Sequence, residues 1–366
     1  MKPVESHFTL SRQCGTIRVM IHEKITIFVS IAIIVSIVLI FILPRLSCNL
    51  NLSVTTGSVR DKSTVSENMP MENSHNTYKI MKDVGEAYMD RFGLNDADFT
   101  LLRDARFTII EGNFDMCASE EDVRYFLDKS YEYGLKVILP AGSGEAEWGY
   151  ECDKESYPKT QKPIWNKTAV TRWINLWNDH PALFGWDSSN EAGGNFPNPT
   201  PENMLTVAQL QQAYSDIKMA DPIHPVIIRI NGWYFYDYET DFFRNGNPFA
   251  DNIADVVMVN AYSNVDEYFP DFVGTVADRS IRSIGRYSPK AQVFIALGVW
   301  SEPPLWRTPS IENLTNDINQ LNNRTDITGI AYFKYGAAGS EWYMPDKTIG
   351  NPEIWDFIAL RNQEGK

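Results

Sequence analysis

Histidine is scarce in this chain, and its scarcity argues against two common kinds of catalytic site. The 366 residues include only 5 histidines, at positions 7, 22, 75, 180 and 224, and none of them falls at the carboxyl end of a predicted strand. A histidine-based metal site and a Ser-His-Asp triad are therefore not expected. A Walker loop and a Gly-x-Gly-x-x-Gly loop are also missing. We accordingly expect neither a metal nor a nucleotide cofactor.

Positive charge is also in short supply. The formal net charge is −14 and the isoelectric point is about 4.9. No basic stripe is present for a phosphate backbone, so nucleic-acid binding is not expected. Hydrophobic residues make up 43% of the chain, which suits one large folded domain. Aromatic residues reach 13%, a share that fits either a large core or a site for neutral ligands such as sugars.

One segment near the amino terminus carries no charge at all. From Ile25 to Leu43 the residues are mostly Ile, Val, Leu and Phe, and this run is long enough to cross a bilayer as a helix. Basic residues precede it, so the positive-inside rule places the short tail in the cytosol. A cleaved signal peptide would have a shorter apolar run, and a lipoprotein signal ending at Cys48 would not have Arg45 before it. We therefore predict an uncleaved type II anchor.

The anchor divides the chain into four predicted parts. Residues 1–24 are expected to form a cytosolic tail and residues 25–44 the membrane anchor. Residues 45–76 are rich in Ser, Thr and Asn with little apolar periodicity, which is typical of a flexible stalk. Residues 77–366 then form a folded domain outside the cytoplasm.

Two further features agree with an exported domain. The chain has glycosylation acceptor sequences that begin at Asn51, Asn166, Asn313 and Asn323. Cysteine is limited to 4 residues. Of these, Cys117 and Cys152 lie in predicted loops and are candidates for a disulfide bond in an oxidising compartment.

The folded part alternates short apolar runs with amphipathic segments of helix length. Val123, Phe126 and Tyr131, for example, have helical spacing after an N-cap at Ser119, and Asn351 caps the last helix. The predicted strands lie within residues 77–89, 107–110, 135–139, 183–189, 226–230, 256–260, 293–297 and 327–333. About eight such units in roughly 290 residues are what a TIM barrel requires. A doubly wound open sheet is the rival, but no dinucleotide loop follows the first strand. We predict an α/β fold of the (β/α)8 TIM barrel type.

Polar and aromatic side chains follow nearly every predicted strand. In a (β/α)8 barrel these strand ends share one rim, which carries the chemistry. The rim residues that we single out are Glu111, Trp148, Asn190, Glu191, Trp233, Asn260, Tyr262, Trp300, Glu302, Lys334, Glu341 and Trp342. Sugars are bound by this mixture, because their CH faces stack on aromatic rings and their hydroxyls hydrogen-bond to amides and carboxylates. The rim therefore favours a carbohydrate site.

The stretch from Pro181 to Gly194 is the clearest of these strand ends. Its apolar run stops abruptly at Asn190 and Glu191, which indicates a buried strand that delivers a carboxylate to its carboxyl end. The alternative is a core strand whose polar end caps the next helix. The side chains of Asp187 and Glu191 are expected on the same face of the strand, so we expect Asp187 deeper in the barrel as a hydrogen-bond acceptor.

The sequence His180-Pro-Ala-Leu-Phe-Gly-Trp-Asp-Ser-Ser-Asn-Glu191 resembles the fourth-strand motif of clan A glycoside hydrolases, (β/α)8 enzymes that include cellulases and β-galactosidases. Weaker similarity extends from about Thr77 to Leu360, as in Val259-Asn-Ala-Tyr262. The resemblance implies that Glu191 is the acid/base and that Asn190 hydrogen-bonds the sugar 2-hydroxyl.

One residue that the resemblance implies is missing. Clan A enzymes place a nucleophilic glutamate at the end of the seventh strand, but residues 292–298 contain no acid and Ala296 stands in its place. Glu302, a few residues later, is the candidate for a displaced nucleophile if its loop folds back. Glu111 and Glu341 are other candidates for a second carboxylate. Each of these three is otherwise an ordinary exposed residue of the rim.

The sequence supports two hypotheses on function. The first is a membrane-anchored glycoside hydrolase that cleaves O-glycosidic bonds of a β-linked oligo- or polysaccharide, with Glu191 as general acid/base and Glu302 as second carboxylate. The second is a barrel that has lost its nucleophile and binds carbohydrate or a surface partner without turnover. In both, the lipid bilayer is contacted through residues 25–44. The residues predicted to bind substrate are Asn190, Trp148, Trp233, Asn260, Tyr262, Trp300, Lys334 and Trp342.

Overall fold

The computed structural model describes residues 77–86, 89–142, 165–191, 205–237, 250–265, 267–302, 304–336 and 351–364. All of them belong to one compact unit of the chain. The predicted tail, anchor and stalk lie outside these residues and stay predictions. Within the described part, none of the helices is both long enough and apolar enough to cross a membrane.

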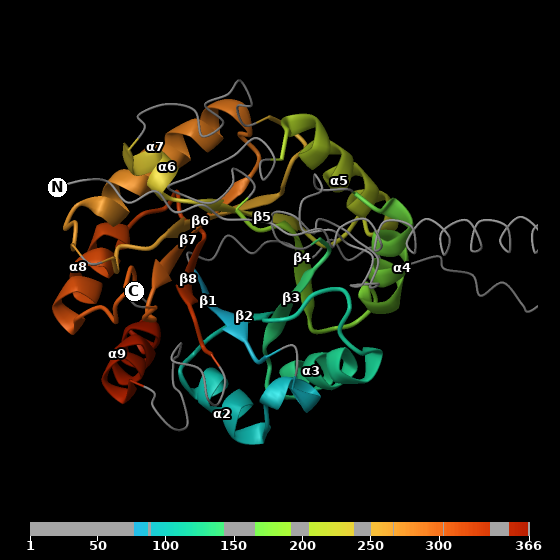
Figure 1. Ribbon diagram of the computed structural model, residues 1–366, viewed down its shortest axis with the longest axis horizontal. Helices are drawn as coiled ribbons and strands as arrows, with labels where there is room; N and C mark the ends of the chain where they lie inside the picture. The colour runs from blue at the N-terminus through green and yellow to red at the C-terminus, as the bar shows by residue number, and fades with distance from the viewer. Residues whose placement is uncertain are drawn as a thin grey trace, which may run out of the picture. The chain divides into compact units, whose positions relative to one another are not determined.

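Eight parallel strands close into a barrel (Figure 1). They are β1 (Tyr78–Val84), β2 (Ile109–Gly112), β3 (Lys136–Pro140), β4 (Leu183–Ser189), β5 (Val226–Asn231), β6 (Val256–Ala261), β7 (Gln292–Gly298) and β8 (Gly329–Phe333). Each strand pairs with the next in chain order, and β8 pairs with β1 to close the ring. The predicted (β/α)8 barrel is thus confirmed, including the strand between residues 77 and 89.

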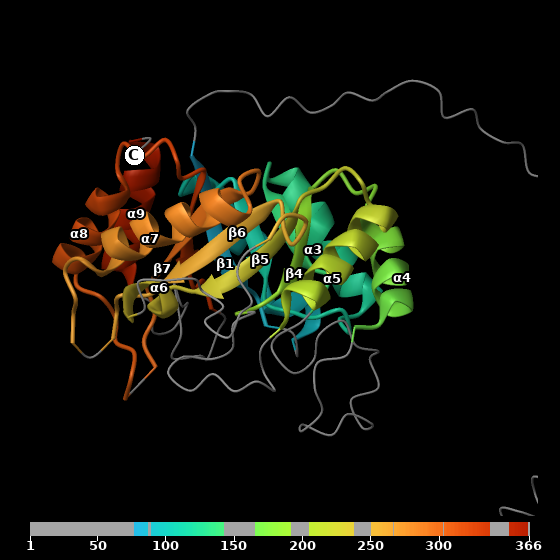
Figure 2. The ribbon, with the colours of Figure 1, turned by 90° about the horizontal axis from the view of Figure 1, so that it is seen from above.

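Helices follow the strands and surround the barrel. They are η2 (Asp90–Gly93), α2 (Asp96–Asp104), α3 (Glu120–Glu132), α4 (Lys167–Trp177), α5 (Val207–Ala220), α6 (Trp233–Asp237), α7 (Phe272–Tyr287), α8 (Ile311–Leu321) and α9 (Pro352–Gln363). In Figure 2 the strands lie between α8 and α9 on one side and α4 and α5 on the other. This arrangement buries both faces of every strand.

Apolar side chains fill two layers. Inside the barrel, Ile80, Ile138, Ile227 and Phe294 pack against one another and are almost fully buried. A larger cluster fills the space between the outer surface of the barrel and the helices. Because the strands are apolar on both faces, they appear in the sequence as short continuous apolar runs between amphipathic segments, and these runs located them.

Local capping explains where several helices begin. Ser119 accepts a hydrogen bond from the backbone of Asp122 at the start of α3, and Asn351 does the same for Ile354 at the start of α9. Both caps were predicted. The cap of α5 is Thr206, which forms a capping box with Gln209. Asn190 and Glu191 are therefore not the cap of α5, and the residues between Glu191 and Leu205 lie outside the described part of the chain.

The short helix α6 was not predicted. Its five residues make little more than one turn, which is too short for a helical period to show in the sequence. It contains Trp233, Tyr234 and Phe235, which are all buried. In the sequence, a run of aromatic residues with no polar residue between them is compatible with a loop beside a ligand as well as with a buried turn of helix.

Candidate active site

Glu191 lies just beyond the carboxyl end of β4 and is half-buried. One of its carboxylate oxygens accepts a hydrogen bond from Asn260 Nδ2 at 3.2 Å, and the other accepts one from Asn231 Nδ2 at 3.4 Å. These two amides come from the ends of β6 and β5. Three neighbouring strand ends therefore meet at this carboxylate, as the strand-end argument predicted.

The backbone of Glu191 is in the left-handed region, with φ of 48°. A residue with a Cβ pays a conformational cost there of about 1 kcal/mol or more. Such conformations persist where the surroundings fix the residue, and they cluster at functional sites. The two amide hydrogen bonds supply that fixation at Glu191.

A buried lysine enters the same site from β1. Lys82 Nζ donates to Asn260 Oδ1 at 3.0 Å and to Tyr262 Oη at 3.0 Å. Its side chain has no exposed surface. Burial lowers the pKa of Lys82 below its ordinary value, although the nearby carboxylate of Glu111 opposes the shift.

Arg229 of β5 joins two buried carboxylates inside the barrel. Its guanidinium lies 2.9 Å from Glu111 Oε1 and 2.6 Å from Asp187 Oδ2. Burial raises the pKa of Asp187 to about 7, and Arg229 opposes that shift. Asp187 thus lies deeper in the barrel and accepts a hydrogen bond, as its position in the strand predicted. Glu111 is only 4% exposed and bound to Arg229, so it is not the exposed rim residue expected as the alternative to a catalytic role.

An aromatic group closes one side of the barrel end. Trp300 packs edge-on against Tyr262 and Phe333, with ring centroids 4.8 and 4.7 Å apart. Trp306 lies against Trp300 at 4.9 Å and against Tyr262 at 6.0 Å. Trp300 is only 3% exposed and Tyr262 8%, whereas Trp306 is half-buried. The outer ring of this group is therefore Trp306, which sequence reasoning missed although it shares a loop with Trp300 and Glu302.

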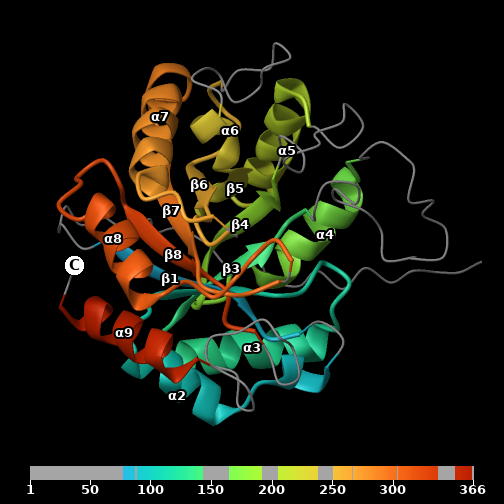
Figure 3. The same ribbon diagram turned by 60° about the vertical axis from the view of Figure 1, so that its left-hand side comes forward.

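Trp306 also shows how the loop after β7 is folded. The backbones of Glu302 and Trp306 exchange two hydrogen bonds of 2.9 Å, which form a short hairpin between β7 and α8. Because the ring of Trp306 reaches Tyr262, this loop (orange in Figure 3) folds back over the end of the barrel. The Glu302 side chain itself is exposed on the hairpin.

The end of β7 is closely packed. Ala296 is fully buried in the interior of the barrel. A Cβ at Gly298, the next position on that face, would lie 1.9 Å from Asn264 Oδ1. The missing seventh-strand acid is thus reflected in the packing as well as in the sequence.

The remaining predicted residues are placed as follows. Asn190 is half-buried beside Glu191, and Lys334 follows β8 with its Nζ 5.8 Å from the ring of Phe333. Trp233 belongs to a different aromatic group, because its ring lies 4.3 Å from that of Phe272 on α7. Trp148, Glu341 and Trp342 lie outside the described residues.

The predicted disulfide is described on one side only. Cys117 is disulfide-bonded. Cys152 lies outside the described residues, so its pairing with Cys117 stays a prediction. Among the described residues, no group of three or more His, Cys, Asp or Glu side chains is arranged to hold a metal ion.

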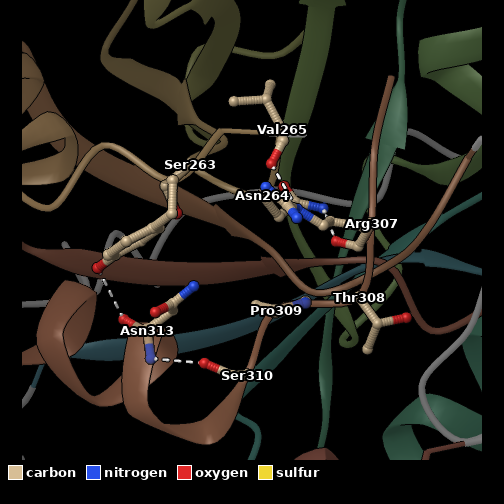
Figure 4. A pocket seen from close by; sticks show the side chains of 9 residues that line it. Ser263, Asn264, Val265, Arg307, Thr308, Pro309, Ser310 and Asn313 are labelled. Atoms are coloured by element: carbon tan, nitrogen blue, oxygen red, sulfur yellow. Dashed lines mark hydrogen bonds between the residues drawn. The ribbon is translucent and has the colours of Figure 1, made fainter. Parts of the chain in front are cut away.

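A hollow of about 320 Å³ lies on the loops that follow β6 and β7 (Figure 4). Asn264 spans these loops, since its Nδ2 donates to the carbonyl oxygens of Trp300 at 2.7 Å and Arg307 at 3.2 Å. Ser310 and Asn313, from the first turn of α8, line the opposite wall. The hollow therefore lies beside the aromatic group, and Asn264 ties the loops that form it.

Comparison with known proteins bears on the fold. Neither a protein-family model nor a curated protein sequence matches the chain. Among solved structures, β-glucuronidase 2 of Bacteroides uniformis is similar with a TM-score of 0.55 and 12% identity, over 79% of this chain and 35% of that one. Endo-1,4-β-mannanase of Rhizomucor miehei is similar with a TM-score of 0.54 and 11% identity, over 79% and 95% of the two chains. Endo-β-1,4-mannanase of Thermotoga petrophila gives 0.52 and 11%, over 80% and 77%.

The chain spans only about a third of the length of the glucuronidase, whereas it matches nearly all of the Rhizomucor mannanase. At these identities the likeness concerns the fold. This protein has a (β/α)8 barrel fold similar to the folds of these glycosidases.

Proposed function

We propose that the barrel is a glycoside hydrolase that acts on a β-linked glycan at the carboxyl end of its strands. The observation that carries the proposal is the placement of Glu191, whose two oxygens are held by amides from the two following strands. A carboxyl group fixed beside an aromatic surface is suited to transfer a proton to a glycosidic oxygen. The glycosidases of similar fold support the same reading.

In this mechanism Glu191 protonates the oxygen of the leaving group and then removes a proton from water. Asn190, directly before it, is placed to hydrogen-bond a hydroxyl of the sugar. Glycosidic cleavage needs a second carboxylate, as nucleophile or as base. Glu302 is the described carboxylate on the loop that covers the barrel end, and we assign it this role.

Buried polar atoms give independent support for a polar ligand. Glu111 Oε2, Asp187 Oδ1, Arg229 Nε and Trp300 Nε1 are buried and have no hydrogen-bond partner among the described residues. Buried polar atoms are nearly always hydrogen-bonded in native proteins. Water in the barrel interior, or a ligand hydroxyl that reaches it, would satisfy these atoms.

Binding without turnover is the second candidate function. It is favoured by the end of β7, which carries no acid and where a Cβ at Gly298 would meet Asn264 Oδ1. Arg229 also engages Glu111 and Asp187, the two other carboxylates of the barrel interior. A barrel of this kind would hold a glycan on its aromatic group and release it unchanged.

One experiment separates the two functions. The full chain is screened against aryl β-glycosides and β-linked oligosaccharides, and binding of the same oligosaccharides is measured by calorimetry. Hydrolysis supports the first proposal. Binding without hydrolysis favours the second, and the absence of both would contradict a carbohydrate site.

Replacement of Trp306 by alanine tests the aromatic surface. We expect Trp306→Ala to weaken oligosaccharide binding about tenfold, or about 1.4 kcal/mol, because the ring offers a stacking face at the barrel end. Tyr131→Ala is the control, since Tyr131 is a 60% exposed aromatic residue on α3. Equal affinity in the two variants, measured by calorimetry, would remove Trp306 from the site.

We further propose that the barrel is held at a membrane by residues 25–44 and faces away from the cytoplasm. Protease added outside intact cells should then release a soluble fragment that begins between Cys48 and Asn76. The amino-terminal sequence of the released fragment is the measurement. A domain that is cut only after the cells are permeabilised would contradict this topology.

A further inference from the structure

Lys82 has no place in the mechanism above, although it lies next to the proposed acid/base. It comes from β1, where Tyr78 and Ile80 precede it on the face that points into the barrel. Its side chain is fully buried. Burying an ammonium group costs several kcal/mol unless it is hydrogen-bonded and near opposite charge. A lysine kept in such a place calls for a specific role.

Asn260 connects Lys82 to Glu191 through two hydrogen bonds. Lys82 Nζ donates to Asn260 Oδ1 at 3.0 Å, and Asn260 Nδ2 donates to Glu191 Oε1 at 3.2 Å. An ammonium group can only donate, and a side-chain amide has one accepting end and one donating end. Lys82 therefore determines that the oxygen of Asn260 faces inward and its nitrogen faces Glu191.

The amide of Asn231, which also contacts Glu191, is oriented in the same way by a backbone N–H. Asn231 Oδ1 accepts a hydrogen bond from the backbone N–H of Trp233 at 3.0 Å, which turns Asn231 Nδ2 toward Glu191. A backbone N–H cannot be removed by changing a side chain. Of the two amides, only Asn260 depends on a side chain that can be replaced.

Burial disfavours the charge of Lys82, and the charged groups around it are of both signs. Glu111 of β2, Asp187 of β4 and Asp83 of β1 attract the ammonium group, and Arg229 of β5 repels it. Its other hydrogen-bond acceptor is Tyr262 Oη at 3.0 Å. Lys82 Nζ is thus within hydrogen-bond distance of both Asn260 and Tyr262.

We infer that Lys82 is a positioning residue, which orients Glu191 for proton transfer by fixing the amide of Asn260. The role rests on the proposed function of Glu191. Without Lys82 the amide of Asn260 loses this fixed direction and can also turn its oxygen toward the carboxylate. In that orientation the side chain of Glu191 keeps only the hydrogen bond from Asn231.

The kinetic test uses Lys82→Met, which keeps the length of the side chain and removes its donors. We expect kcat for an aryl glycoside to fall about 10- to 100-fold, as for other residues that orient a catalytic group, with little change in KM. Lys79→Met is the matched control, because Lys79 is a buried lysine of the same strand. Its kcat should stay near that of the native protein.

A double-mutant cycle shows whether Lys82 acts through Asn260. If it does, Lys82→Met combined with Asn260→Ala should lose no more activity than Asn260→Ala alone. Losses that multiply would overturn the inference. Lys82→Gln serves the same cycle if Lys82→Met does not fold, because its amide can accept as well as donate and no longer fixes the direction of Asn260.

A second readout does not depend on catalysis. In the full chain labelled with 15N-asparagine, the side-chain amide signals of Asn260 and Asn231 should both move when Glu191 is replaced by glutamine. In a Lys82→Met background the Asn260 signal should no longer respond, whereas that of Asn231 still should. A response of Asn260 that persists without Lys82 would overturn the inference even if no glycoside is cleaved. Loss of that response in an inactive protein would contradict only the proposed function.

Discussion

Glu191→Gln is expected to lower kcat/KM for an oligosaccharide by roughly 10²- to 10⁴-fold, the usual contribution of general acid/base catalysis. Glutamine has nearly the same shape and cannot deliver a proton. Glu191 is half-buried at the end of β4, so its replacement should leave the fold intact. The measurement is steady-state hydrolysis at several pH values, with thermal unfolding as the check on the fold.

The chemistry of the leaving group sharpens this test. An aryl glycoside with an acidic phenol needs little protonation, so its first cleavage step should survive in Glu191→Gln far better than that of an oligosaccharide. Glu302→Gln is the companion variant. It should abolish turnover of both substrates if Glu302 is the nucleophile or base. Unchanged hydrolysis in Glu191→Gln would remove the acid/base role, whatever the second variant does.

Much of this site was predictable because parallel strands end on one rim. Asn260 and Tyr262 were selected because they lie at the end of a predicted strand, in a stretch that also carries the family resemblance, and the structure brings both to the site where Glu191 lies. The boundaries of β4, Leu183–Ser189, were predicted to the residue. A buried apolar run that ends in polar residues indicates both the strand and the carboxyl end that contributes to the site.

The charged interior was not predicted in the same way. Lys82 and Arg229 lie within strands that are buried on both faces, and in such strands the alternation of polar and apolar residues does not show which face points inward. A lysine in an uncertain first strand is more often exposed than buried. Only the closed barrel shows that Lys82 points to Asn260 and Arg229 to two carboxylates.

The local path of the chain after β5 and after β7 was not predicted. Trp233 was predicted to bind substrate, and this stays a prediction; the unpredicted helix α6 brings its ring against Phe272 of α7. Trp306 was overlooked, although the hairpin after β7 places it over Tyr262. Loop conformation decides both cases, and short loops carry little periodic signal.

The largest effect on stability is expected at Arg229. Arg229→Met would leave Glu111 and Asp187 without their shared partner in the barrel interior. Both carboxylates are at most 6% exposed. Removing one partner of a buried ion pair typically costs about 3–5 kcal/mol, because a buried charge is left without compensation. We expect a loss of this size in the free energy of unfolding, measured with guanidinium chloride.

Arg324 supplies a matched control. It also pairs with two carboxylates, Asp278 and Asp326, but these are 58% and 45% exposed. Exposed pairs contribute about 1 kcal/mol or less, so Arg324→Met should change stability only slightly. A second comparison adds Glu111→Gln and Asp187→Asn to Arg229→Met. If unpaired charge is the cause, the triple variant should recover most of the stability that Arg229→Met loses.

The pKa of Asp187 determines how the stability loss in Arg229→Met changes with pH. Burial raises the pKa of Asp187 from its ordinary value of 3.8 to about 7. Within that window the folded protein holds a proton that the unfolded chain has released, so this group makes stability fall as the pH rises. At pH 5, inside this window, Asp187 is protonated in the folded protein and has little need of Arg229. The loss caused by Arg229→Met should therefore be larger at pH 8 than at pH 5. A loss that is equal at both pH values would show that Arg229 stabilises the barrel by filling space, because packing does not depend on the charge of its neighbours.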